Sequence, residues 1–180
     1  CPAYEPSFPA CYAHHGDSNS FKIAINFTDL ANEALSTISN TYDIKQDLED
    51  VRQTLARQFL SFALKVQSVG ENIAESTNLT FRGIDVNYKP SGTQFGSVTS
   101  IVERLISQQF GAEGTVFGTS MLSEILEKLQ IKQCSLDRVV YSVLEDDNLC
   151  QKNNLGLIKL SDLLLYSTVG SEGLSLIPLA

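Results

Sequence analysis

The chain has 180 residues, 43% of them apolar, which suffices for one compact domain with a sizeable core. Thirteen basic residues stand against 21 acidic ones, giving a formal net charge of -8. A surface of that sign repels phosphate backbones and anionic lipid, so we expect no nucleic-acid partner. No apolar stretch approaches the roughly 20 residues that a bilayer-crossing helix needs, so we expect no membrane span.

Residues 1–19 form the first segment, which is rich in proline and carries the adjacent His14 and His15. It shows neither a helical nor a strand pattern. We therefore predict an irregular N-terminal arm over 1–19 and one helical domain over 20–180.

Helices are predicted along almost all of the remaining chain. The strongest pattern runs from Ile44 to Ile73, where apolar residues recur every three or four positions and predict a helix of about eight turns. Other helices are expected over 20–39, 97–111, 119–132, 135–147 and 156–168, and 77–96 is interpreted as a long ordered loop. The fold class predicted is all-α: about six amphipathic helices bundled around the long central one.

The four cysteines are Cys1, Cys11, Cys134 and Cys150, and none forms a CxxC pair. This spacing favours disulfides over a zinc site. The helix expected over 135–147 would separate the last two cysteines by roughly 18 Å, whereas a disulfide spans at most about 7 Å between Cα atoms. We expect the arm's cysteines to bond with Cys134 and Cys150, with the connectivity left open.

Two further features point to secretion. Asn26 and Asn78 each begin an N-glycosylation acceptor tripeptide. The chain also lacks an initiator methionine and a hydrophobic leader, as a mature form after signal removal would. We expect an extracellular glycoprotein, with a bacterial lipoprotein lipidated at Cys1 as the alternative.

Catalytic motifs do not occur in the sequence. It contains no GxSxG, GxxxxGK[ST] or HExxH, and no GxGxxG after a strand. Most carboxylates fall on polar faces of the predicted helices. We expect a protein that is not an enzyme and that holds neither a metal nor a cofactor.

Several segments resemble the N-terminal domains of spidroins, the spider silk proteins. The run IVERLIS at 101–107 is similar to that family's fourth helix, and Glu124 with Ile125 to its fifth. The segments that carry the resemblance are 42–50, 60–63, 70–75, 101–107 and 114–125. Together they span roughly residues 20–130.

This resemblance implies a secreted domain that dimerises as the pH falls and thereby assembles silk or a related fibre. Its acidic relay would fall on Asp50, Glu71, Glu75 and Glu124, with Arg57 as the basic partner. Clustered carboxylates raise one another's pKa, and protonation would then remove the repulsion that blocks association.

Two other functions stay open. The bundle could be a secreted carrier that encloses a small apolar ligand, with Phe81, Tyr88 and Phe95 at its entrance. It could also be a recognition module on the surface of a microbe or parasite, with another protein as its partner. Self-association at lower pH would separate the silk hypothesis from both.

Overall fold

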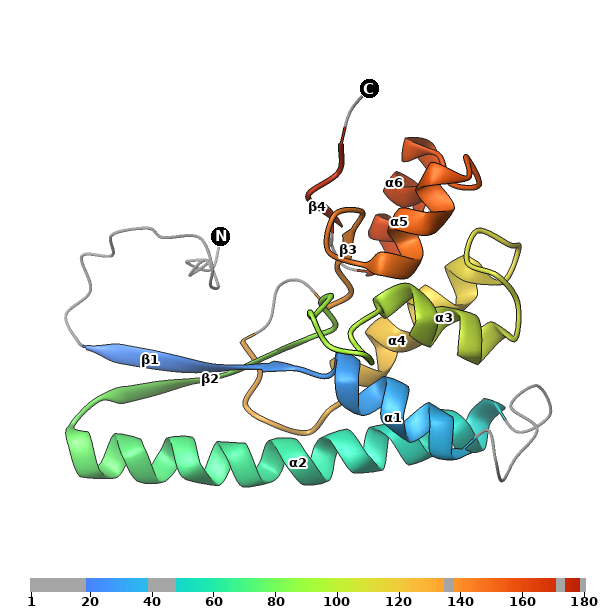
Figure 1. Ribbon diagram of the computed structural model, residues 1–180. Coiled ribbons are helices and arrows are strands. Elements are labelled where there is room, and N and C mark those ends of the chain that lie inside the picture. The colour runs from blue at the N-terminus through green and yellow to red at the C-terminus, as the bar shows by residue number, and fades with distance from the viewer. Residues whose placement is uncertain (1–18, 39–47, 135–137, 171–173, 179–180) are drawn as a thin grey trace.

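A computed structural model of the chain describes residues 19–38, 48–134, 138–170 and 174–178 (Figure 1). The fold is mixed α/β, so the prediction of an all-α bundle is wrong. Each of the first three strands is followed by two helices. The elements are β1 Ser20–Asn26, α1 Thr28–Ile38, α2 Leu48–Thr77, β2 Thr80–Asn87, α3 Val98–Ile106, α4 Thr115–Glu127, β3 Tyr141–Ser142, α5 Asp147–Asn154, α6 Leu160–Gly170 and β4 Leu174–Ser175.

The strands pair in parallel and in chain order. β1 pairs with β2 from Ser20 opposite Thr80 to Asn26 opposite Asn87. On the other side of β2, isolated parallel bridges join it to the chain at 133 and 139, just before β3, and β3 pairs with β4. Parallel neighbours require long crossovers, which the helix pairs provide. The carboxyl ends of the strands therefore lie along one edge.

Three segments, two predicted as helices and one as a loop, contain strands or extended chain instead. Phe21, Ile23 and Ile25 alternate along β1, and this period of two is typical of a strand, although 20–39 was expected to be one helix. The segment 77–96 contains the eight-residue β2 rather than only a loop. The helix expected over 135–147 is wrong where the structure describes it, because 139–142 is extended and bridges β2.

The long helix is confirmed as α2, which runs beneath β1 and β2 in Figure 1. Its buried face differs from the predicted one in the second half. Phe62, Val69 and Ile73 are exposed, whereas Ala63 and Gly70 are buried. At these two positions the helix therefore buries a small residue rather than a large apolar one.

Gly70 lies directly against Phe81 of β2, since a Cβ atom on Gly70 would come within 2.7 Å of the ring atom Cζ. We expect Gly70→Ala to lower the free energy of unfolding by about 1 to 2 kcal/mol. Overpacking costs roughly 1 to 3 kcal/mol, and the better helix propensity of alanine returns only part of it. Urea denaturation measures the loss. Gly92→Ala is the control, because a Cβ there meets nothing within 4 Å; an equal loss in both variants would contradict the close approach.

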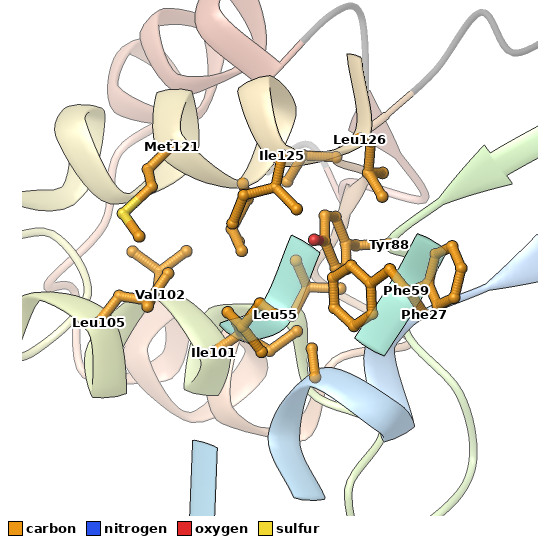
Figure 2. Packing of buried hydrophobic residues seen from close by; sticks show 14 of the residues in the cluster. Phe27, Leu55, Phe59, Tyr88, Ile101, Val102, Leu105, Met121, Ile125 and Leu126 are labelled. Carbon is orange, nitrogen blue, oxygen red and sulfur yellow. The ribbon is translucent and has the colours of Figure 1, made fainter. Parts of the chain in front are cut away.

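One hydrophobic core joins the helices to the sheet (Figure 2). The rings of Phe27 and Phe59 stack with centroids 4.5 Å apart, and Tyr88 meets Phe59 edge-on at 6.0 Å. Met121 and Ile125 of α4 face the side chains of α3 across the same core. This packing fixes where β2 ends and where α3 begins.

The N-terminal arm lies outside the described residues, so the division at residue 19 stays a prediction. Cys1 and Cys11 fall in that arm. Cys134 and Cys150, which are described, are free thiols, so the disulfides expected at these two cysteines are wrong and no disulfide occurs among the described residues. In the same part of the chain, no helix combines the length and the apolar character that crossing a membrane requires.

Candidate functional site

A polar hollow of about 280 Å³ lies where β2 and β3 end. One wall is the loop that follows β2, and the other is the chain between β3 and the first turns of α5. The lining residues are Ser91, Thr93, Gln94, Gly96, Ser97, Ser100, Glu145, Asp147, Asn148 and Gln151. Parallel α/β proteins bind their ligands at the carboxyl ends of strands, so this hollow is the candidate functional site.

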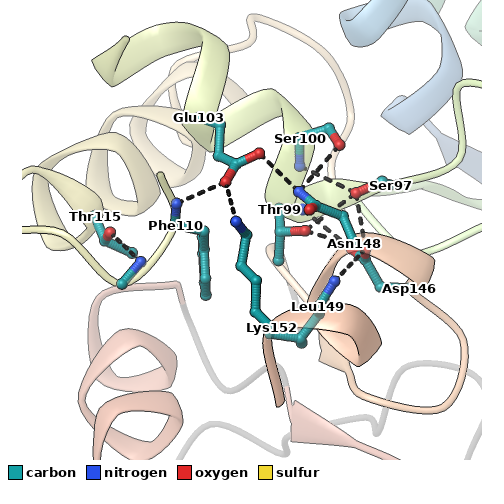
Figure 3. A network of polar contacts seen from close by, with 11 residues as sticks. Ser97, Thr99, Ser100, Glu103, Phe110, Thr115, Asp146, Asn148, Leu149 and Lys152 are labelled. Carbon is teal, nitrogen blue, oxygen red and sulfur yellow. Dashed lines mark hydrogen bonds and ion pairs between the residues drawn. The ribbon is translucent and has the colours of Figure 1, made fainter. Parts of the chain in front are cut away.

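Asp146 joins the two walls through hydrogen bonds to residues of both (Figure 3). Its side chain is 1% exposed and caps α5 by accepting a hydrogen bond from the N–H of Leu149 at 3.2 Å. It also accepts bonds from the Ser97 hydroxyl at 2.7 Å and from the Thr99 N–H at 3.0 Å, in the first turn of α3. A single carboxylate therefore satisfies donors at the beginnings of two helices.

A second polar cluster holds the hollow from the other side. Lys152 of α5 places its ammonium 2.6 Å from the carboxylate of Glu103 on α3. The same carboxylate accepts from the Phe110 N–H and from the Asn148 amide, both at 2.8 Å. Partial burial raises the pKa of Glu103, but the bonds from Lys152, Phe110 and Asn148 outweigh it, and the pKa lies below its ordinary value.

The loop after β2 is closed by its own backbone. The N–H of Ser91 donates to the carbonyl of Gly96 at 2.9 Å. Only glycine fits at position 96, because a Cβ atom there would come 2.0 Å from the carbonyl oxygen of Ser91. Ser91 and Thr93 both donate their hydroxyl protons to Asp29, which follows β1. Both residues also line the hollow.

Three hydroxyls and one amide of the lining therefore have their protons committed to other protein groups. The protons of the Ser91, Thr93 and Ser97 hydroxyls are committed to carboxylates, and the amide of Asn148 donates to Ser100 and Glu103. The exposed carboxylates of Glu145 and Asp147 add negative charge. This arrangement suits a ligand that donates hydrogen bonds and carries positive charge.

The five residues of the predicted acidic relay do not gather at one site. Asp50, Arg57 and Glu71 are exposed on α2, where 21 positions separate the two carboxylates by roughly 30 Å. Glu75 lies one turn beyond Glu71. Glu124 lies on α4, where it pairs with Arg52 at 3.5 Å and with Lys128.

The predicted glycosylation sites occupy different surroundings. Asn26 ends β1 instead of lying in a helix, and its amide donates to the carbonyl of Lys89 while its oxygen accepts from the N–H groups of Thr28 and Lys89. Asn78 is exposed between α2 and β2 at φ 57°. Glycosylation of either residue stays a prediction, and His14 and His15 lie outside the described residues.

Comparison with known proteins decides the family. A family model described as "Uncharacterised ACR (DUF711)" matches residues 1–180, the whole chain. The chain therefore belongs to the DUF711 family. The relationship to spidroins that the sequence segments implied is therefore wrong.

Bacterial proteins described as "UPF0210 protein" are similar to this DUF711 chain. One from Lactobacillus helveticus is 27% identical over 152 residues, covering 78% of this chain and 34% of the relative. One from Bifidobacterium adolescentis is 29% identical over 140 residues, covering 73% and 30%. One from Clostridium beijerinckii is 27% identical over 146 residues, covering 74% and 32%. The chain spans about a third of the length of these curated relatives.

The functional hypotheses drawn from the sequence are wrong, as is the all-α fold that they assumed. A secreted module that assembles silk by pH-dependent dimerisation does not agree with bacterial DUF711 relatives. The hypotheses of a carrier for an apolar ligand and of a surface recognition module rested on the same disulfide-stapled all-α bundle. Phe81 and Tyr88, expected at a cavity entrance, are buried in the core.

Sequence reasoning also missed the residues that build the hollow. The acidic run at 145–147 was interpreted as the end of a helix, whereas Asp146 caps the beginning of one. Aspartate is among the residues that favour the N-cap, so a helix beginning after Asp146 was the available signal. Nothing in the sequence pairs Glu103 with Lys152, which lie 49 positions apart. Within the described ranges, no group of three His, Cys, Asp or Glu side chains could hold a metal ion.

Proposed function

We propose that the polar hollow binds a small molecule that carries an amine or guanidine group. The observation that supports this is a lining in which hydroxyl protons already bond to carboxylates and to which Glu145 and Asp147 add negative charge. An ammonium or guanidinium group has donors only, so it complements hydroxyl oxygens whose protons are already used.

The size and rigidity of the hollow support the same proposal. Its volume of about 280 Å³ lies just below the roughly 300 to 1,000 Å³ of sites for drug-sized ligands, so a compact molecule fits. The Ser97 hydroxyl and the Asn148 amide are held in place by Asp146 and Glu103. A site whose polar groups are already oriented loses little side-chain entropy on binding.

Titration of the chain with agmatine, glycerol and succinate tests the proposal, with affinity measured by calorimetry. We expect agmatine to bind and the neutral and anionic molecules to bind at least tenfold more weakly. The double variant Glu145→Gln with Asp147→Asn should weaken agmatine binding roughly tenfold, since each partly exposed ion pair contributes about 0.2 to 1 kcal/mol.

A matched control separates the hollow from the general negative charge of the protein. Glu33→Gln with Glu113→Gln removes the same two charges from exposed positions that do not line the hollow. This variant should bind agmatine like the unchanged protein. Equal weakening in the two double variants, or glycerol binding as tight as agmatine binding, would refute the proposed site.

The proposal concerns binding and assigns no reaction. The expectations that the chain is not an enzyme and that it is extracellular stay predictions.

A further inference from the structure

A second concavity lies between α2 and the C-terminal part of α4. Its volume is about 250 Å³. Four apolar residues form the floor: Ala56 and Leu60, one helical turn apart on α2, Ile125 on α4, and Leu129 just after the end of α4. The short side chain of Ala56 leaves the space open where a longer one would reach across to α4.

Three basic residues, Arg52, Arg57 and Lys128, also line this groove, and they differ in whether a carboxylate pairs with them. Arg52 pairs with Glu49 at 2.8 Å and with Glu124 at 3.5 Å, and Lys128 pairs with Glu124. Among the described residues, Arg57 donates only to the Gln53 carbonyl and the Thr54 hydroxyl of its own helix.

The Arg57 guanidinium therefore has no carboxylate partner among the described residues. These two hydrogen bonds use two of the five N–H donors of the guanidinium. The other donors are available at the edge of the apolar floor. A planar guanidinium in this state suits a carboxylate, which it can bind through two parallel hydrogen bonds.

We propose that this groove binds a small amphipathic carboxylate. The apolar tail lies on Ala56, Leu60, Ile125 and Leu129, and the carboxylate meets Arg57. The volume is below that of sites for drug-sized ligands, which limits the tail to a short chain or a single ring. This site is separate from the polar hollow and does not depend on it, since the two share no lining residue.

Three probes that differ in one feature each test the groove. Octanoate has both the tail and the charge, 1-octanol lacks the charge, and acetate lacks the tail. We expect NMR titration of the ¹⁵N-labelled chain to show octanoate shifting the amides of α2 around Ala56 and of α4 around Ile125. 1-Octanol and acetate should bind at least fivefold more weakly. 1-Octanol binding as tight as octanoate binding would overturn the proposal, and so would shifts confined to other elements.

Two variants separate the charge from the floor. Arg57→Gln should weaken octanoate binding about fivefold to tenfold and leave 1-octanol binding unchanged, as expected for loss of a charge-assisted contact. Ala56→Leu fills the groove and should abolish the binding of both. Lys159→Gln, at an exposed position outside the groove, is the control for net charge. Octanoate affinity that is unchanged in Arg57→Gln, or lowered equally in Lys159→Gln, would refute the role of Arg57.

Discussion

Asp146→Ala is expected to lower the free energy of unfolding by about 4 kcal/mol. The substitution leaves two N–H groups without their acceptor. One belongs to Thr99 in the first turn of α3, and the other to Leu149 in the first turn of α5. An unsatisfied buried donor costs roughly 1 to 3 kcal/mol, and loss of an N-cap costs about 1 kcal/mol. Relief of the cost of burying the carboxylate offsets part of this sum. Urea denaturation followed by circular dichroism measures the change.

The neighbouring residue is a matched control for this prediction. Asp147 is exposed in the first turn of α5, so Asp147→Ala should change stability by at most about 0.5 kcal/mol. Asp146→Asn keeps one acceptor oxygen, so its free energy of unfolding should lie between those of the two alanine variants. Hydrogen exchange should show lost protection at the first turns of both α3 and α5. Loss confined to α5 would show that Asp146 does not join the two helices.

Local pattern was enough to predict the long helix but not the sheet. The apolar spacing between 44 and 73 fills many turns, and α2 lies over 48–77. β1 has only seven residues, and its alternating Phe21, Ile23 and Ile25 run without a clear break into the apolar residues of α1. A short strand directly before an amphipathic helix was therefore interpreted as part of that helix. The two-residue β3 and β4 offer even less pattern.

The candidate site could not be predicted because its contacts join distant parts of the chain. Ser97 and Asp146 are 49 positions apart, and they meet because the end of β2 lies beside residue 139, just before β3. Each residue alone has an ordinary local explanation, since serine and aspartate both favour N-caps. Only the parallel order of the strands places the two N-caps together, and that order was hidden once β1 and β2 were interpreted as helix and loop.

Lys152→Met is expected to lower the free energy of unfolding by about 3 kcal/mol. The side chain of Lys152 is only 10% exposed, and its loss leaves the partly buried carboxylate of Glu103 without a cation. Breaking a buried ion pair at one partner costs roughly 3 to 5 kcal/mol, and the remaining bonds from Phe110 and Asn148 place this case at the lower end. The double variant Glu103→Gln with Lys152→Met should recover much of the loss, because no charge is then left unpaired.

The pH dependence of the same pair provides an independent measurement. The pKa of Glu103 in the folded protein lies below its ordinary value, so the unfolded chain takes up the proton first as the pH falls. The contribution of the pair is complete above about pH 4.3, the ordinary pKa of glutamate, and is lost as the pH falls through the folded-state pKa. Lys152→Met removes the largest contact that lowers this pKa, so the fall in its stability below pH 4.3 should be shallower than in the unchanged protein.

Lys128→Met is the control for both measurements on this pair. It breaks the exposed pair with Glu124 and should cost less than about 1 kcal/mol. Equal losses in Lys152→Met and Lys128→Met would mean that the Glu103–Lys152 pair is solvated like a surface pair. The same conclusion would follow if the stability of Lys152→Met fell with decreasing pH as steeply as that of the unchanged protein. The wall of the hollow formed by Asn148 would then be held by the capping bonds of Asp146 rather than by Glu103.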